Sequence, residues 1–285
     1  MARARADSTE GMIKFCLKGS SGLITGASAG IGLEFARQLS EYATSLVLVA
    51  RRGERLQSLR DELTKLNPKL IVHIRTMDLS CDQMIVELCD WLDRENLSID
   101  LLVNNAGLGD MGSCASSDLQ RVKEMLAVNV AALTSLTRLL LPGMIKQRRG
   151  AILNVSSSAG FLPIPGFAVY AASKAYVTSF SEAIRAELRG TGVIVTSLCP
   201  GPVETEFQQV ARRNHSGQKR SSPKLSHVAV EEVVRTALDA LASDKPLVIP
   251  GLIMKIGMFI VRLVPLSVLR LASRFHVSAT KSLPR

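Results

Sequence analysis

The amino-acid sequence predicts an α/β fold, in which a parallel seven-stranded sheet is doubly wound by helices within one domain. Three observations predict this class. Seven short runs rich in Val, Ile and Leu occur along the chain, and such runs are typical of strands buried on both faces. Segments of helical length separate the runs, and this alternation favours a parallel sheet. A glycine-rich turn follows the first run, where the first strand should meet the first helix.

The expected elements follow one another in a regular order. The strands are expected at residues 22–25, 45–50, 70–77, 99–104, 150–156, 192–198 and 246–250. The clearest helices are expected at residues 30–42 and 119–144. We expect residues 1–18 to form a polar tail, residues 19–250 the sheet domain, and residues 251–285 a C-terminal helical extension. Residues 201–227 lack clear periodicity and exceed ordinary connections in length, which predicts a lid or binding loop.

Composition places the chain among globular proteins. Of its 285 residues, 47% are apolar and 21% are charged, which is enough apolar material for a substantial core. The five cysteines are odd in number and include no CxxC pair, which argues against a disulfide framework and against a metal site. The N-terminus has no apolar segment of the length that a secretory signal needs. We therefore expect a cytoplasmic protein with no metal.

The formal net charge of +10 is concentrated near the C-terminus. Residues 245–285 contain seven Lys and Arg and no acidic residue, which leaves 28 basic and 25 acidic residues in the rest of the chain. No run of basic residues is interleaved with aromatic residues, so nucleic-acid binding is not expected.

The glycine-rich turn reads Thr25-Gly-Ala-Ser-Ala-Gly-Ile-Gly32. Glycine lets the backbone approach a pyrophosphate closely, and a helix N-terminus offers free N–H groups and the positive end of its dipole. The spacing is GxxxGxG, which a mere tight turn would also explain. Its place on the first strand-to-helix connection favours phosphate binding, with the candidate residues Gly26, Ser28, Gly30, Ile31 and Gly32.

Two arginines stand at the end of the second expected strand. A site that prefers NAD(H) would place an acidic residue there for the ribose 2′-hydroxyl, whereas this chain has Arg51 and Arg52. A guanidinium binds a 2′-phosphate through paired, charge-assisted hydrogen bonds. We therefore predict NADP(H) as the cofactor; mere solvation of the strand end is the alternative for both arginines.

A tyrosine and a lysine are spaced for one helix face. Tyr170 and Lys174 are four residues apart, so the hydroxyl and the amine can reach the same small volume. Taken alone, the pair fits a solvent-exposed amphipathic helix as well as it fits a site.

Taken together, the motifs resemble the classical short-chain dehydrogenase/reductase family from about residue 19 to about residue 250. They are the glycine-rich turn, Asp78-Leu79, Asn104-Asn-Ala-Gly107, Asn129, Asn154-Val-Ser-Ser-Ser158, Tyr170-x-x-x-Lys174 and Pro200-Gly201. Each is common by chance, but their order and spacing are specific. The resemblance implies a Rossmann fold and hydride transfer between NADP(H) and a small-molecule carbonyl or alcohol.

The resemblance also implies residue roles. Tyr170 is expected to act as general acid and base, and the Lys174 cation to favour the phenolate and to bind the nicotinamide ribose. Ser157 is expected to donate to the substrate oxygen, and Asn129 to hold a water of a proton relay. Other expected cofactor positions are Asp78, Leu79, Asn105, Ala106, Gly107, Pro200, Gly201, Val203 and Thr205, although Asp78 could equally cap the next helix and Val203 could belong to the core.

Apolar residues fall where the family's substrate pocket is expected. They are Met111, Phe161, Leu162, Ile164, Phe167, Phe207 and Val210. They favour an apolar ketone, aldehyde or 3-oxoacyl-type substrate, although core packing explains many of them as well. A rival substrate is an acyl thioester on an anionic carrier, which basic residues of the 201–227 loop would bind. These basic residues, which a solvated loop would explain equally well, are Arg212, Arg213, Lys219, Arg220 and Lys224.

The C-terminal extension is apolar but interrupted. Lys255 and Arg262 lie within it and Pro265 would break a helix, so a membrane span is not expected. One side of a helical wheel gathers Lys255, Arg262, Arg270 and Ser273, which predicts peripheral membrane contact through residues 251–274. A helical cover over the substrate pocket or a subunit interface is the alternative. The resemblance implies a homodimer or homotetramer, and the apolar run at residues 125–141 suits such an interface or burial against its own sheet.

Two functions of different classes are compatible with these residues. An NADP(H)-dependent oxidoreductase is favoured because every expected catalytic residue type is present in register. A catalytically silent NADP(H)-binding sensor or scaffold is the alternative, which a missing Tyr170 or Lys174 would have indicated.

Overall fold

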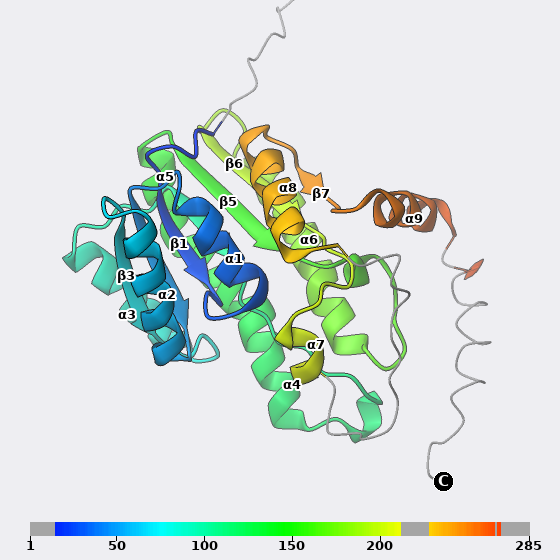
Figure 1. Ribbon diagram of the computed structural model, residues 1–285. Helices are drawn as coiled ribbons and strands as arrows, with labels where there is room; N and C mark the ends of the chain where they lie inside the picture. The colour runs from blue at the N-terminus through cyan, green and yellow to red at the C-terminus, as the bar shows by residue number, and fades with distance from the viewer. Residues whose placement is uncertain (1–14, 212–227, 266, 269–285) are drawn as a thin grey trace, which may run out of the picture.

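The computed structural model of the protein describes residues 15–211, 228–265, 267 and 268, and their strands form one parallel sheet (Figure 1). The strand order is β3-β2-β1-β4-β5-β6-β7, with every neighbouring pair parallel. The strands are β1 (Ser21–Thr25), β2 (Ser45–Ala50), β3 (Ile71–Thr76), β4 (Leu101–Asn104), β5 (Gly150–Val155), β6 (Val193–Leu198) and β7 (Leu247–Val248). The predicted doubly wound Rossmann fold is confirmed, with its topological switch between β1 and β4.

Helices cover both faces of the sheet (Figure 1). One face packs against α1 (Gly30–Leu39), α2 (Gly53–Leu66) and α8 (Val230–Ala242). The other packs against α3 (Asp82–Arg94), α5 (Leu133–Lys146) and α6 (Ala168–Glu187). Alternate residues of one strand therefore belong to different cores: Leu46 and Leu48 of β2 face α1, and Val47 and Val49 face α3. Burial on both faces explains why the strands read as continuous apolar runs.

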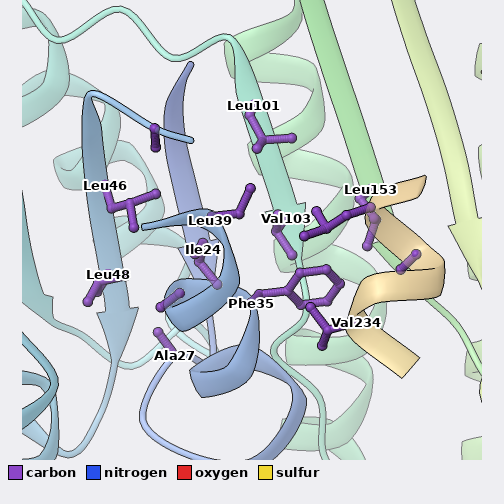
Figure 2. Packing of buried hydrophobic residues seen from close by; sticks show 14 of the residues in the cluster. Ile24, Ala27, Phe35, Leu39, Leu46, Leu48, Leu101, Val103, Leu153 and Val234 are labelled. Atoms are coloured by element: carbon purple, nitrogen blue, oxygen red, sulfur yellow. The ribbon is translucent and has the colours of Figure 1, made fainter. Parts of the chain in front are cut away.

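Phe35 of α1 is the largest fully buried side chain, with 0% of its surface exposed. Figure 2 shows its ring between Val103 of β4, Leu153 of β5 and Val234 of α8. This packing fixes α1 against the middle of the sheet. The N-terminus of α1 is thereby held at the carboxyl end of β1, next to the switch in strand order.

The segment predicted as a long helix is one continuous helical run with an irregular centre. It consists of α4 (Leu119–Leu126), the π-helical turn η2 (Ala127–Ala132) and α5. The Asp118 carboxylate caps its start by accepting from the Gln120 N–H at 2.9 Å. Within the described residues it is the one helix whose length and hydropathy would suffice for a membrane span, yet Leu136 and Met144 pack it against the sheet.

The ends of the chain differ from the expected boundaries. Phe15 is buried in the same core as Phe35, and the Arg149 guanidinium lies 5.0 Å from the centroid of its ring. The packed domain therefore includes Phe15, rather than beginning at residue 19, because the aromatic ring closes the core beside α1 and β5. The basic loop residues Arg212, Arg213, Lys219, Arg220 and Lys224 and the tail residues Arg270 and Ser273 lie outside the described residues.

Two helices near the C-terminus lie outside the two helical layers. α7 (Glu206–Ala211) follows β6 and the Pro200-Gly201 turn, and α9 (Leu252–Leu263) follows β7. Figure 1 shows α9 extending beyond the edge of the sheet, where it contacts the 3₁₀ turn η3 (Ser158–Phe161). The helix ends at Leu263, and Val264 has an extended backbone just before Pro265, as the predicted interruption requires.

Candidate active site

The first strand-to-helix turn is shaped by its glycines. Gly26 and Gly30 have φ angles of +66° and +55°, a region that side chains with a Cβ rarely adopt. A Cβ on Gly26 would lie 2.9 Å from the Ala106 Cα, and one on Gly30 would lie 3.1 Å from the Thr205 Cγ2. No side chain caps α1 at Ala29, so its first N–H groups can bind an anionic ligand. This cradle fits the pyrophosphate of a dinucleotide.

Asn105 ties this turn to the loop after β4. Its Nδ2 donates to the carbonyls of Thr25 at 2.8 Å and Gly26 at 3.3 Å. The Thr25 hydroxyl in turn accepts from the backbone N–H groups of Asn105 and Ala106 at 2.9 and 3.0 Å. Gly32 lies behind this junction, where a Cβ would overlap the Asn105 amide and the Gly26 carbonyl. The close packing at this junction therefore requires glycine at position 32.

A cavity of about 710 Å³ lies along the carboxyl ends of the strands. Every residue that the sequence nominated for catalysis or cofactor binding lines it, except Gly32 and Asn129. The volume lies within the range of small-molecule and cofactor sites. Residues from the first turn to the segment after β6 thus meet in one space. Among the described residues, no three His, Cys, Asp or Glu side chains gather closely enough to hold a metal.

One end of the cavity is basic and lies beside the glycine-rich turn. Arg52 lines it, and its Nε donates to the Ser28 hydroxyl at 3.2 Å. The Arg52 Nη1 also forms an ion pair of 2.7 Å with Glu206 of α7. Arg51 lines the same end with 55% of its side chain exposed. These two guanidinium groups could hold the 2′-phosphate of a dinucleotide.

Asp78, after β3, lines the same end. Its carboxylate accepts from the N–H and the hydroxyl of Ser80 at 3.0 and 2.8 Å, and it lies 3.9 Å from the Arg51 Nη1. Burial acts to raise the pKa of Asp78, but the Ser80 hydrogen bonds and the Arg51 charge outweigh burial and lower it. Asp78 therefore does not cap α3, which begins after Cys81 without a side-chain cap.

Tyr170 lies near the start of α6, where the cavity becomes apolar. Its ring centroid is 4.3 Å from that of Phe167 and 5.5 Å from that of Phe207. Only 7% of the residue is exposed. Burial raises the pKa of Tyr170 to about 12, although a hydrogen bond with the Ser157 side chain acts to lower it. The phenol therefore carries its proton at neutral pH and could donate it to a bound oxygen.

Lys174 follows one helical turn later and is also buried. Its Nζ donates to the Val155 carbonyl at 2.8 Å and lies 5.8 Å from the Tyr170 ring centroid. Burial lowers the pKa of Lys174 to about 8, and nearby Cys199 acts in the opposite direction. At neutral pH the amine is therefore mostly a cation next to the phenol, which is the expected arrangement.

The three consecutive serines after β5 have different surroundings. Ser156 is 2% exposed, and its hydroxyl donates to the Lys174 carbonyl at 2.7 Å and pairs with the Thr178 hydroxyl at 2.7 Å. Ser157 instead hydrogen-bonds Tyr170 and accepts from the Ala159 N–H at 3.1 Å. Ser156 thus anchors α6, while the hydroxyl of Ser157 is the one next to the phenol.

Asn129 lies beneath the cavity on the π-helical turn η2, with 1% of its surface exposed. Its Oδ1 accepts from the Leu108 N–H at 2.8 Å, and its Nδ2 donates to the Leu108 carbonyl at 2.9 Å and to the Ser173 hydroxyl at 3.0 Å. Both amide hydrogens are used. The Asn129 side chain therefore holds the loop after β4 against α6.

The other end of the cavity is apolar. Leu162, Ile164, Phe167, Phe207, Val210 and Met111 line it as expected, joined by Met254 and Met258 of α9. Phe161 was expected there too, but it lies outside the lining because its ring packs under the Arg262 guanidinium of α9, at 5.0 Å. The contribution of α9 was foreseen only as an alternative to membrane contact.

Sequence reasoning missed several residues that act through pairing. Glu206 bridges Arg52 and Arg55, and Ser173 supports Asn129. Glu206 directly follows the predicted Thr205, which is the one available signal. Its partners lie more than 150 residues away, and no local pattern reveals such a contact.

The chain is similar in sequence to known proteins over most of its length. The chain matches the family model described as short chain dehydrogenase over residues 22–216. It is 40% identical over 190 residues to sulfoacetaldehyde reductase 2 of Chromohalobacter salexigens, which covers 66% of this chain and 74% of that protein. It is 37% identical over 198 residues to the NADP-dependent 3-hydroxy acid dehydrogenase YdfG of Escherichia coli K12, which covers 69% of this chain and 78% of that protein.

Solved structures show the same architecture. A short-chain dehydrogenase from Sphingobium yanoikuyae in complex with NADPH superposes with a TM-score of 0.72 at 26% identity, covering 93% of this chain and 97% of that one. The bulky-bulky ketone specific alcohol dehydrogenase from Comamonas testosteroni gives a TM-score of 0.71 at 26% identity, covering 93% and 95%.

Proposed function

Because the chain belongs to the short-chain dehydrogenase family, we propose that it is an NADP(H)-dependent oxidoreductase that interconverts an apolar carbonyl compound and its alcohol, with Tyr170 as general acid and base. One observation carries this proposal. A glycine cradle, two arginines and the group Ser157, Tyr170 and Lys174 line a single cavity. The bound cofactor would supply or accept the hydride.

The two arginines support NADP(H) as the cofactor. Arg51 and Arg52 directly follow β2, at a place where a carboxylate would repel a 2′-phosphate. The Escherichia coli relative is named as NADP-dependent, and the Sphingobium yanoikuyae structure contains NADPH. Asp78 and the backbone of the 105–107 loop would flank the adenosine, and the segment from Pro200 to Thr205 would flank the nicotinamide.

Proton transfer is assigned to Tyr170. During reduction, negative charge grows on the substrate oxygen and must be met by a proton and by hydrogen-bond donors. The buried phenol of Tyr170 keeps its proton at neutral pH and lies beside the apolar end of the cavity. The Ser157 hydroxyl would donate a second hydrogen bond to that oxygen. In the oxidation direction, the Lys174 cation reduces the cost of forming the phenolate.

Asn129 has a positioning role in this proposal. Its side chain bonds both backbone groups of Leu108 and thereby holds the loop that carries Gly107. A Cβ on Gly107 would lie 3.4 Å from the Lys174 Nζ, so the loop and the lysine are in close contact. The water relay expected at Asn129 stays a prediction.

The cavity lining supports an apolar substrate. Leu162, Ile164 and Phe207 line the cavity together with Tyr170, and Met254 and Met258 of α9 add to this apolar lining. The relatives named above act on different carbonyl or hydroxy compounds, so the substrate class is argued from this chain alone. The thioester alternative depends on loop residues outside the described part of the chain and has no support from the cavity itself.

The proposal is tested by following NADPH absorbance with a panel of ketones, aldehydes and 3-oxoacyl thioesters. Wild-type protein should turn over apolar ketones or aldehydes, and Tyr170→Phe should lose turnover while it retains NADPH affinity. Turnover that survives in Tyr170→Phe would contradict the assigned role. NADPH binding without turnover of any class would favour the sensor or scaffold function.

The outward face of α9 supports a second proposal, namely peripheral contact with an anionic lipid surface. Six large apolar side chains on it are 51% to 72% exposed: Leu252, Ile253, Ile256, Phe259, Ile260 and Leu263. Residues 245–285 add seven basic residues and no acid, which favours anionic headgroups. The same helix lines the cavity on its inner side, so an apolar substrate could enter from the lipid.

Vesicle flotation tests this second proposal. Wild-type protein should float with phosphatidylserine vesicles, and Ile256→Glu/Phe259→Glu should not. The control Leu66→Glu/Ile71→Glu changes two equally exposed apolar residues on α2 and β3 and should still float. Absence of flotation by the wild type would remove the proposal, and an α9-dependent dimer in light scattering would instead assign this face to a subunit interface.

Assembly and location also stay predictions. The outer side of α4 and α5 exposes Leu126, Leu139 and Ile145, which supports the expected homodimer or homotetramer. A monomeric mass in light scattering would contradict it. The cytoplasmic location rests on composition alone.

A further inference from the structure

We propose that Glu206 is a cofactor-specificity residue, which competes with the 2′-phosphate of NADP(H) for Arg52 while Arg55 retains the displaced carboxylate. The inference rests on the proposed function, because it requires NADP(H) in the cavity.

Glu206 begins α7 and bridges two arginines. Its Oε2 lies 2.7 Å from the Arg52 Nη1. Its Oε1 and Oε2 lie 2.7 and 2.9 Å from the Arg55 Nη1. Hydrogen bonds from Arg52 and Arg55 lower the pKa of Glu206, so the group is a carboxylate at neutral pH. A negative charge supplied from α7 therefore occupies the basic end of the cavity.

Arg52 connects this carboxylate to the phosphate-binding turn. It lines the main cavity, and its Nε donates to the Ser28 hydroxyl of the glycine-rich turn at 3.2 Å. A guanidinium presents a limited set of N–H donors in one plane. A carboxylate and a phosphate that approach the same edge therefore compete for them. A 2′-phosphate that pairs with the Nη1 group of Arg52 displaces at least part of the Glu206 contact, and one that pairs with the Nη2 group lies beside the Glu206 charge.

Arg55 explains how that exchange can occur without leaving an unpaired acid beside a phosphate. It lies one helical turn after Arg52 on α2 and is absent from the lining of the main cavity. Because Arg55 already contacts both oxygens of Glu206, it can keep the carboxylate when Arg52 turns to the phosphate. Without Arg55, Glu206 would either stay on Arg52 or repel the incoming dianion.

NAD(H) has no 2′-phosphate and does not enter this competition. Glu206 therefore weakens the binding of NADP(H) but not of NAD(H), and so reduces the preference for NADP(H) that Arg51 and Arg52 create. Exposed ion pairs are weak because water screens them, so the expected change in affinity is small. Removing the carboxylate should tighten NADPH binding by roughly three- to five-fold and leave NADH binding nearly unchanged.

The test is a set of dissociation constants for NADPH and NADH, measured by calorimetry on the full chain. Three variants form a cycle: Glu206→Gln, Arg55→Gln and the double variant. Glu62→Gln is the matched control, because Glu62 of α2 forms an equally short ion pair of 2.7 Å with Arg37 and does not line the main cavity. It removes the same charge from the same neighbourhood without freeing Arg52.

Glu206→Gln should bind NADPH more tightly, and Arg55→Gln should bind it roughly three-fold more weakly. The double variant should match Glu206→Gln, because Arg55 is needed only while Glu206 is charged. If Arg55→Gln lowers the NADPH affinity equally in wild type and in Glu206→Gln, Arg55 is a direct phosphate ligand and the proposal is overturned. An unchanged affinity in Glu206→Gln, or the same gain in Glu62→Gln, would also overturn it. Wild-type protein that binds no NADPH would instead refute the proposed function.

Discussion

Replacing Ser157 by alanine should lower kcat, whereas replacing the neighbouring Ser156 should lower the free energy of unfolding. The Ser157 hydroxyl is bonded to Tyr170 and faces the cavity. Loss of one donor to a developing oxyanion lowers kcat by about 10²–10³, or roughly 3–4 kcal/mol. The loss of folding stability should be small, because besides Tyr170 the Ser157 hydroxyl contacts only the Ala159 N–H among the described residues, and that bond is worth about 0.5–1.5 kcal/mol.

Ser156→Ala should give the opposite result. The buried hydroxyl of Ser156 joins the end of β5 to α6 through the Lys174 carbonyl and the Thr178 hydroxyl. Its removal leaves buried partners short of a hydrogen bond, which costs about 1–3 kcal/mol. The free energy of unfolding should fall by that amount, while kcat falls less than roughly ten-fold, because the Tyr170 hydroxyl keeps its Ser157 partner.

The assay pairs steady-state NADPH oxidation on the best substrate of the panel with urea unfolding of both variants. The reasoning is refuted if Ser157→Ala keeps kcat within about three-fold of wild type while a folded Ser156→Ala loses it. That outcome would move the oxyanion contact to Ser156.

Three further outcomes are expected. Burial lowers the pKa of Lys174 to about 8, so between pH 8 and about 10 the unfolded chain holds a proton that the folded protein has released. The free energy of unfolding should therefore rise with pH in this range, by up to about 1.4 kcal/mol per pH unit. Urea-unfolding stabilities that change with pH in the same way for wild type and Lys174→Met would contradict this. Phe35→Ala should lower the free energy of unfolding in urea by about 3–5 kcal/mol, and a loss below about 1 kcal/mol would show that Phe35 does not organise the core. Gly32→Ala should weaken NADPH binding in calorimetry by at least roughly ten-fold, because the added Cβ would meet the Gly26 carbonyl. The control Gly143→Ala, whose added Cβ would meet nothing, should bind NADPH as wild type does. Equal NADPH affinities in the two variants would contradict the packing role of Gly32.

The fold could be predicted because its information is local. Buried strands such as β5 read as continuous apolar runs, and the first turn carries its glycines in sequence. The relation of Tyr170 to Lys174 is also local, since helix geometry alone places them together. The sequence therefore predicted the strands, their parallel arrangement and one wall of the cavity.

The remaining features depend on long-range packing. Phe161 looked like a pocket residue but lies under Arg262 of α9, about a hundred positions away, and no periodicity links them. Asn129 was predicted to hold a water and Gly32 to belong to the phosphate-binding turn, and neither of them lines the cavity. A motif shows that a residue is needed, but it does not show whether the residue touches the ligand or holds another residue that does.

The π-helical turn η2 constrains how this chain can change over evolution. One extra residue in the turn sets the direction of Asn129 relative to α4 and α5. Deleting a single residue between Ala127 and Ala132 would restore a regular helix and leave α5 in register, because a π-helical turn takes up one extra residue without changing the rotation of the residues that follow. Leu136 and Met144 would keep their contacts with the sheet, whereas Asn129 would lose its direction toward Leu108. We therefore expect homologous sequences that lack the equivalent of Asn129 to show a one-residue gap at this turn.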